Sequence, residues 1–136
     1  MRNELIEPEG WKAPKGYANG VLARGVSDLL FVAGQIGWDA EQRLVTGGFV
    51  AQFRQALENV AAVVAAADAR PEDIVRLTIY VTDKRLYLDE VREIGAVYRD
   101  VLGKHFPAMA LVQVADLLEE GAQVEIEATA VVRGQS

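Results

Sequence analysis

Two glutamates near the C-terminal end of the chain are the side chains best placed to do chemistry. Glu125 and Glu127 alternate with the apolar residues Val124, Ile126 and Ala128. This alternation predicts a strand with both carboxylates on one face, because successive side chains of a strand point to opposite sides. Two interpretations stay open. The pair is solvated at the surface, or a partner subunit half desolvates one carboxyl group, whose raised pKa then lets it move protons to and from water.

Other catalytic or binding chemistries have little support in the residues. The chain has no cysteine and a single histidine, His105, so neither thiolate chemistry nor a transition-metal site is expected. Ser27 and Ser136 lie outside any Gly-x-Ser-x-Gly motif, and no glycine-rich phosphate-binding motif occurs. The net charge of −6 disfavours nucleic acid and anionic membranes as partners, because both attract cationic surfaces. Since no apolar run spans a bilayer and the first residues do not resemble a signal peptide, we expect a cytoplasmic protein.

The hydrophobic pattern predicts one α+β domain covering all 136 residues. Residues 1–16 contain several glycines and prolines and are expected to form an irregular arm. The elements that follow are expected in the order β-β-β-α-β-α-β-β. Strands are predicted at 21–24, 29–33, 42–46, 75–82, 108–115 and 123–132, and helices at 48–68 and about 88–101.

The longer predicted helix is amphipathic. Phe49, Phe53 and Ala56 begin an apolar series with steps of three and four residues, which is typical of one buried helix face. Gln52 and Asn59 are expected on the opposite side of the helix.

Two helices cover only one face of the predicted sheet, so the other face is expected to be open. We expect Tyr80, Met109 and Leu111 on that face, with the last two on the strand beside Glu125 and Glu127. Apolar side chains exposed together in this way usually mark an interface, so we expect an oligomer that packs sheet faces together. The alternative is a set of scattered apolar surface residues.

Five segments of the chain are more informative in combination than any one of them alone. They are GYANGV at 16–21, FVAGQIG at 31–37, QALENV at 55–60, FPA at 106–108 and VEIEATA at 124–130. In this order and at these spacings, they resemble the RidA/YjgF family of reactive-intermediate deaminases, which is also called endoribonuclease L-PSP. The resemblance spans nearly the whole chain.

This resemblance implies a fold, an assembly and an activity. The fold is chorismate-mutase-like, with a mixed six-stranded sheet and two helices on one face. It assembles into a homotrimer whose sheets line a central barrel and whose three small-molecule clefts lie between subunits. In deaminating members these clefts hydrolyse enamines and imines to 2-keto acids and ammonia, and no cofactor is needed.

The resemblance also implies site residues, position by position. Glu125 corresponds to the glutamate that acts on the attacking water, and Tyr17 to the tyrosine of the cleft. Gly34, next to Gln35, corresponds to the glycine of the cleft. The backbone amide of Leu111 corresponds to one that contacts the substrate carboxylate.

Met109 is the main departure from the family pattern. It stands where an arginine binds the substrate carboxylate, which places the chain in the arginine-lacking branch of the family. An arginine gives two charge-assisted hydrogen bonds that a methionine cannot replace, and an unpaired carboxylate loses solvation in an apolar place. The usual activity on 2-imino acids is therefore expected to fall by orders of magnitude. A neutral or more apolar substrate would suit Met109, Leu111 and Trp38.

Three functional hypotheses follow from these residues. The first is a trimeric hydrolase or deaminase for an enamine-type, imine-type or related small metabolite. The second is a trimer that binds a small ligand or a protein and has lost the chemistry. The third is an endoribonuclease, which the net charge and the absence of a histidine pair argue against.

Overall fold

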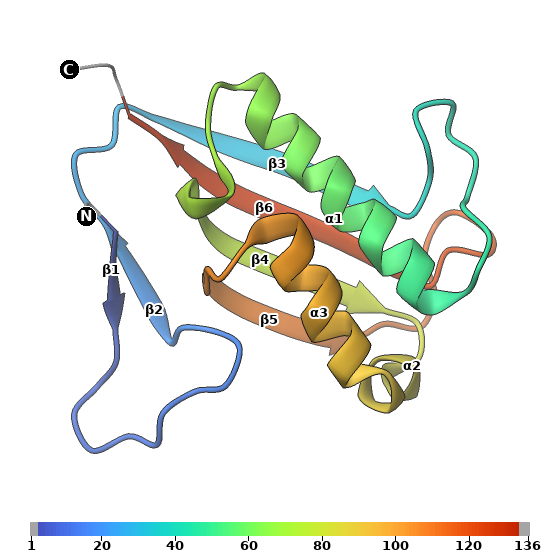
Figure 1. Cartoon of the computed structure of the whole chain (residues 1–136), viewed down its shortest axis with the longest axis horizontal. Coiled ribbons are helices and arrows are strands. Elements are labelled where there is room, and N and C mark those ends of the chain that lie inside the picture. The colour runs from blue at the N-terminus through green and yellow to red at the C-terminus, as the bar shows by residue number, and fades with distance from the viewer. Residues whose placement is uncertain (1–2, 134–136) are drawn as a thin grey trace.

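The computed structural model describes residues 3–133, which form two sheets and a layer of helices (Figure 1). The smaller sheet pairs β1 (Asn3–Ile6) with β2 (Gly20–Ala23), and the larger one has the order β3 (Asp28–Ile36), β6 (Val124–Val132), β4 (Ile74–Val81) and β5 (Ala108–Gln113). Only β4 and β5 are parallel; the other neighbours are antiparallel. The helical elements are α1 (Phe49–Ala66), the single turn η1 (Pro71–Asp73), α2 (Lys84–Asp89) and α3 (Val91–Leu102).

The α+β class, the mixed sheet and the two main helices on one face are confirmed. The six strands are divided between two sheets, because β1 and β2 pair with each other rather than with the larger sheet. The expectation of an irregular arm is therefore wrong for Asn3–Ile6. The carboxylate of Glu7 helps to close this hairpin, since it accepts hydrogen bonds from the backbone and side-chain nitrogens of Asn19 at 2.7 and 3.3 Å.

The predicted strand at 42–46 is absent and is replaced by a loop. Its only ladder contact is an isolated bridge between Trp38 and Leu44. The Asp39 carboxylate accepts hydrogen bonds from the backbone of Arg43 and Glu41, and these bonds hold the pKa of the Asp39 carboxyl below its ordinary value. A short polar side chain that bonds to nearby backbone in this way competes with strand pairing.

Helix α1 buries one face against the larger sheet, as its periodicity predicts. Phe53, Leu57 and Val60 are almost completely buried there. Gln52, however, is only 7% exposed, so the prediction that it lies on the polar side is wrong. The helix ends before Asp68, whose left-handed φ of 59° and the following Pro71 prevent its continuation.

The face of the larger sheet away from the helices is mixed, as expected, but its apolar members differ from those predicted. Phe31, Leu29 and Val112 are 72%, 56% and 42% exposed. Met109 and Leu111 instead pack against the core on the helix side. They face this side because they pair with the buried Leu77 and Ile79 of β4, and paired residues share a face. We call the side that carries Glu125 and Glu127 the open face.

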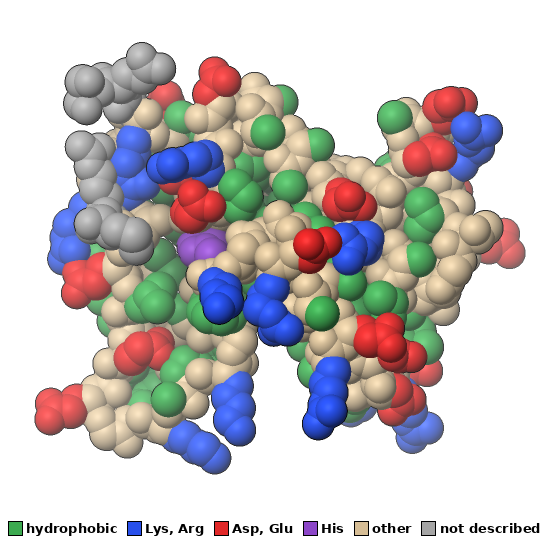
Figure 2. All heavy atoms as spheres, in the orientation of Figure 1, with side chains coloured by type: hydrophobic (Ala, Val, Ile, Leu, Met, Phe, Trp, Pro, Cys, Tyr) green, Lys and Arg blue, Asp and Glu red, His purple; other side chains and the backbone are tan. Residues whose placement is uncertain are grey.

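The helix-covered side has acidic and basic side chains interspersed, without a broad surface of one sign (Figure 2). Within residues 3–133, no helix combines the length and the apolar character that crossing a membrane requires.

Candidate functional site

Glu125 lies directly over Gly34 on the open face. Between Val32 and Gln35, β3 advances three residues while β6 advances two, from Ala128 to Ile126, so β3 bulges at Gly34. A Cβ atom built on Gly34 would stand 2.0 Å from Oε2 of Glu125 and 2.7 Å from its Cδ. The space that a side chain would fill at residue 34 is therefore occupied by the Glu125 carboxylate. Two residues that are 91 positions apart in the sequence meet here.

A second carboxylate lies on the same face and is already engaged. The hydroxyl group of Tyr80 donates a hydrogen bond of 2.7 Å to Oε1 of Glu127. This bond raises the pKa of the Tyr80 hydroxyl, because deprotonation would place two anions together, and slight desolvation adds to the shift. Glu125 and Glu127 therefore differ in their surroundings: one carboxylate accepts a hydrogen bond from Tyr80, and no such bond is described for the other.

We expect Glu127→Gln to bring the pKa of Tyr80 back toward its ordinary value of 10.0. A tyrosine whose pKa is raised by folding contributes stability below its unfolded pKa and loses that contribution as the pH rises through its folded pKa. The tyrosinate absorbance of the folded protein, titrated against the variant, measures the shift. An unchanged titration of all tyrosines would contradict the assignment.

A small cavity of about 170 Å³ adjoins this pair on the open face. It is lined by Phe31, Arg76, Thr78, Glu127 and Thr129, together with parts of Val32 and Ala128. The cavity therefore lies along the polar side chains of β4 and β6, and Glu125 is not among the residues that line it.

Tyr17 and Met109 belong to a different part of the molecule. The backbone N–H of Ala18 donates a hydrogen bond of 3.1 Å to Pro107, and Ala18 forms a parallel bridge with Ala108. This attachment holds Tyr17, which is 41% exposed, beside the beginning of β5.

The strand order separates this group from Glu125. Strand β4 lies between β5 and β6, so the prediction that Met109 and Leu111 lie on the strand next to the glutamates is wrong. Met109 pairs with Leu77 on β4, which in turn pairs with Ala128 on β6, three residues from Glu125. Two strand spacings and three residues put Met109 about 10 Å across the sheet and about 10 Å along it from Glu125. The two side chains also lie on opposite faces of the sheet. One chain therefore does not bring all the predicted site residues together.

Gln35 and Trp38 follow Gly34 along the chain but contribute differently. The side-chain amide of Gln35 donates to the carbonyl oxygen of Ala33 at 3.0 Å, within its own strand. Trp38 is half-buried in the loop after β3, and the side chain of Asn59 on α1 donates to its carbonyl oxygen at 2.9 Å. Both residues are held close to the strand end that carries Gly34.

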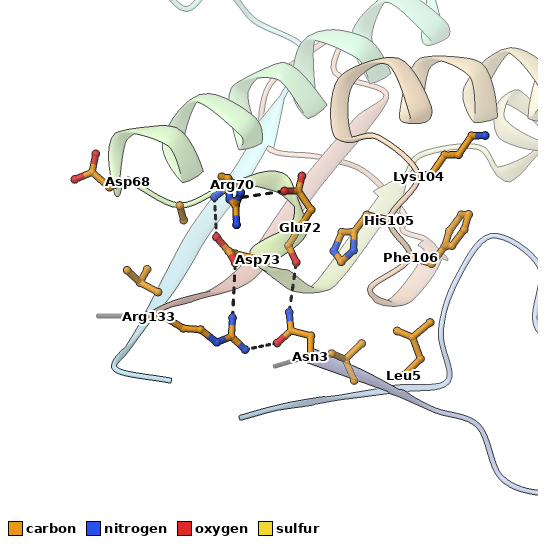
Figure 3. A pocket seen from close by; sticks show the side chains of 13 residues that line it. Asn3, Leu5, Asp68, Arg70, Glu72, Asp73, Lys104, His105, Phe106 and Arg133 are labelled. Atoms are coloured by element: carbon orange, nitrogen blue, oxygen red, sulfur yellow. Dashed lines mark hydrogen bonds and ion pairs between the residues drawn. The ribbon is translucent and has the colours of Figure 1, made fainter. Parts of the chain in front are cut away.

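The largest cavity described, of about 620 Å³, contains none of the predicted site residues (Figure 3). It lies where the β1–β2 sheet meets the body, and its polar groups bind one another. Arg133 forms an ion pair with Asp73 at 3.7 Å and donates to Oδ1 of Asn3 at 2.6 Å. Nε2 of His105 lies 2.6 Å from the carbonyl oxygen of Ile74, so this ring nitrogen is the donor. The bond from Arg133 to Asn3 fastens the N-terminal strand to the body.

Across residues 3–133 there is no group of three or more His, Cys, Asp or Glu side chains that would hold a metal ion.

Residues 10–132 match the family model described as Endoribonuclease L-PSP. The chain belongs to the RidA/YjgF family. RidA/YjgF relatives named 2-iminobutanoate/2-iminopropanoate deaminase include those of Salmonella typhimurium, 37% identical over 89% of this chain and 93% of the relative, and of the goat Capra hircus, 36% identical over 88% and 85%.

Solved structures of the RidA/YjgF family agree in fold. YyfB from Yersinia pestis, described as a protein of unknown function of the conserved Rid family, aligns with a TM-score of 0.84 and 34% identity over 97% of this chain and all of that one. TdcF from E. coli, whose structure contains bound serine, aligns with a TM-score of 0.65 and 32% identity over 95% and 98%.

Proposed function

We propose that this protein is a RidA-like hydrolase of the deaminase type, acting on an enamine, an imine or a related small metabolite in a cleft between the subunits of a homotrimer. The observation that carries the proposal is the Glu125 carboxylate held over Gly34 on the open face. Because residue 34 has no side chain, the carboxylate lies directly against the β3 backbone, and from there it binds the attacking water in the proposed reaction.

The proposed chemistry uses water and the protein's own groups, and no cofactor. Glu125 takes a proton from water as the water oxygen bonds to the imine carbon. That proton goes to the nitrogen, which gives a carbinolamine. The proton of its new hydroxyl group then moves to the amino nitrogen as the C–N bond breaks, and a carbonyl compound and ammonia leave. The hydroxyl group of Tyr17 donates a hydrogen bond to the substrate, and the backbones of Gly34 and Leu111 supply further polar contacts.

A second copy of the chain is needed to complete this cleft. Within one chain Tyr17 and Met109 are separated from Glu125 by strand β4. A partner whose β5 edge approaches the open face would bring the two groups together. The exposed side chains of Phe31, Leu29 and Val112 supply apolar surface for such a contact.

The substrate class follows from Met109. The chain has no guanidinium at the position where the family resemblance implies one, and Met109 packs against the core. A substrate carboxylate in the usual pose would therefore lose its solvation without gaining a cationic partner. The proposed substrate is an imine or enamine without a carboxylate at that position.

The test compares wild type with Met109→Arg on imines generated in situ, one carrying a carboxylate and one apolar and neutral. We expect wild type to favour the neutral imine, and Met109→Arg to raise kcat/KM for the carboxylate-bearing imine by roughly 10-fold or more, given two new charge-assisted hydrogen bonds. Ammonia release measures both rates. Rapid hydrolysis of the carboxylate-bearing imine by wild type would overturn the substrate class.

A non-catalytic, ligand-binding trimer is the second candidate, and Met109 is also the observation that favours it. It predicts that wild type hydrolyses neither imine and that Glu125→Gln leaves ligand affinity unchanged.

A further inference from the structure

Gln52 is the only polar residue other than a tyrosine among the buried residues of the described chain, at 7% exposure. Both ends of its amide group are used. Nε2 donates to the carbonyl oxygen of Gly121 at 3.0 Å, and Oε1 accepts from the backbone N–H of Gln123 at 2.8 Å. Helix α1 therefore holds the turn that enters β6 through two hydrogen bonds from one side chain.

The backbone of the same residue contacts the other strand of the site. A Cβ atom on Gly37 would lie 2.6 Å from Cα of Gln52 and 2.8 Å from its carbonyl oxygen. Glycine at residue 37 thus lets the chain leaving β3 rest directly on the helix backbone. Gln52 is therefore a residue of α1 that contacts both the segment leaving β3 and the turn that enters β6.

These two strands carry the two halves of the candidate site. Glu125 follows Gln123 by two residues, and Gly34 precedes Gly37 by three. The carbonyl oxygen of Gln123 also accepts from the backbone N–H of Thr82 at 3.1 Å, so the entrance to β6 is held from both α1 and the end of β4. Because Glu125 lies within contact distance of the Gly34 backbone, a small shift of β6 against β3 changes where its carboxylate stands.

We infer that Gln52 is a positioning residue for Glu125: its amide holds the 121–123 turn and its backbone holds Gly37, and together they keep the carboxylate over Gly34. This inference rests on the proposed function, in which Glu125 activates water. Gln52 touches neither the open face nor the substrate, so it acts through the strand it holds.

The decisive variant is Gln52→Met, which keeps the length of the side chain and removes both hydrogen bonds. The matched control is Arg54→Met on the same helix, which removes a 2.7 Å ion pair to Asp100 on α3 and touches neither strand. Three quantities are measured in each protein: amide hydrogen exchange at Gln123, the NMR titration of the Glu125 carboxyl group, and kcat and KM for the neutral imine.

For Gln52→Met we expect exchange at Gln123 to become about 10-fold faster or more, the Glu125 titration to change, and kcat to fall roughly 10- to 100-fold with little change in KM. Arg54→Met should leave all three quantities as in wild type. Faster exchange at Gln123 with an unchanged Glu125 titration would overturn the inference and leave Gln52 a purely structural residue.

Two outcomes are kept separate by this design. If wild type hydrolyses no imine, the proposed function fails, while exchange and titration still decide whether Gln52 positions Glu125. If Gln52→Met does not fold, Gln52→Asn takes its place, because it adds no charge and only withdraws the amide group by one carbon from Gly121 and Gln123. The positioning role then predicts a smaller change in the Glu125 titration, and no change would overturn it.

Discussion

Replacing Glu125 with glutamine is expected to lower kcat for imine hydrolysis by roughly 10²- to 10⁴-fold, the range typical for loss of a general base. Glutamine has nearly the same size and fits over Gly34, but its amide does not accept a proton from water. The melting temperature should stay close to that of wild type, since Glu125 is half-buried on the open face and no hydrogen bond to its carboxylate is described. Ammonia release under substrate saturation, together with a thermal unfolding curve, measures both effects.

The control for this experiment is Glu127→Gln on the same strand and face. Its carboxylate binds the hydroxyl group of Tyr80, so the variant loses a structural hydrogen bond and should keep most of the activity. Equal loss of activity in both variants would show that the face as a whole, rather than the Glu125 carboxylate, is needed. Full activity in Glu125→Gln would remove Glu125 from the mechanism.

Two glycine substitutions should differ in their effect on stability. Gly37→Ala places a methyl group 2.6 Å from Cα of Gln52, which is helix backbone and cannot rotate away. We expect it to reduce the free energy of unfolding by about 1–3 kcal/mol, the usual cost of overpacking, and to lower the melting temperature by roughly 5–10 °C. Neither Gly37 nor Gly34 has a left-handed φ, so the effect is one of space and not of backbone strain.

Gly34→Ala meets a side chain instead of a backbone. Its methyl group would take the place of the Glu125 carboxylate, which is the far end of a flexible chain and can swing aside. Activity should therefore fall by about 10²-fold or more, because a misplacement of the order of 1 Å at a reacting group has this effect, while the melting temperature changes little. Thermal unfolding and kcat, measured for both alanine variants, give the comparison. If Gly34→Ala were destabilising and active, the contact between Gly34 and Glu125 would be structural only.

Local pattern was sufficient for most elements of this fold. The steps of three and four residues from Phe49 predict α1 to within two residues at each end, and the alternation from Val124 predicts β6 with Glu125 and Glu127 on one face. Both depend on side-chain periodicity within a single element, which the sequence expresses directly. The strand prediction at 42–46 is wrong because the hydrogen bonds that the Asp39 carboxylate accepts from the backbone N–H groups of Glu41 and Arg43 outweigh a weak strand propensity.

The spacing of residues within α1 indicates that Gln52 is buried. Gln52 lies three residues after Phe49 and four before Ala56, so helical spacing alone places it on the buried stripe. Its polar side chain argued for the other side of the helix. The hydrogen bonds that make its burial tolerable come from Gly121 and Gln123, and their proximity depends on how β6 returns to α1.

By itself, then, the sequence determined the fold class, the amphipathic faces of α1 and β6, and the family. The contact between Glu125 and Gly34, which are far apart in the chain, is a result of the tertiary structure. The tertiary structure decided the neighbours of each strand. Strand β4 lies between β5 and β6, so Met109 is turned toward the core and kept away from Glu125. Strand order is set by pairing between segments far apart in the chain, and the periodicity within one strand contains no information about which strand lies beside it.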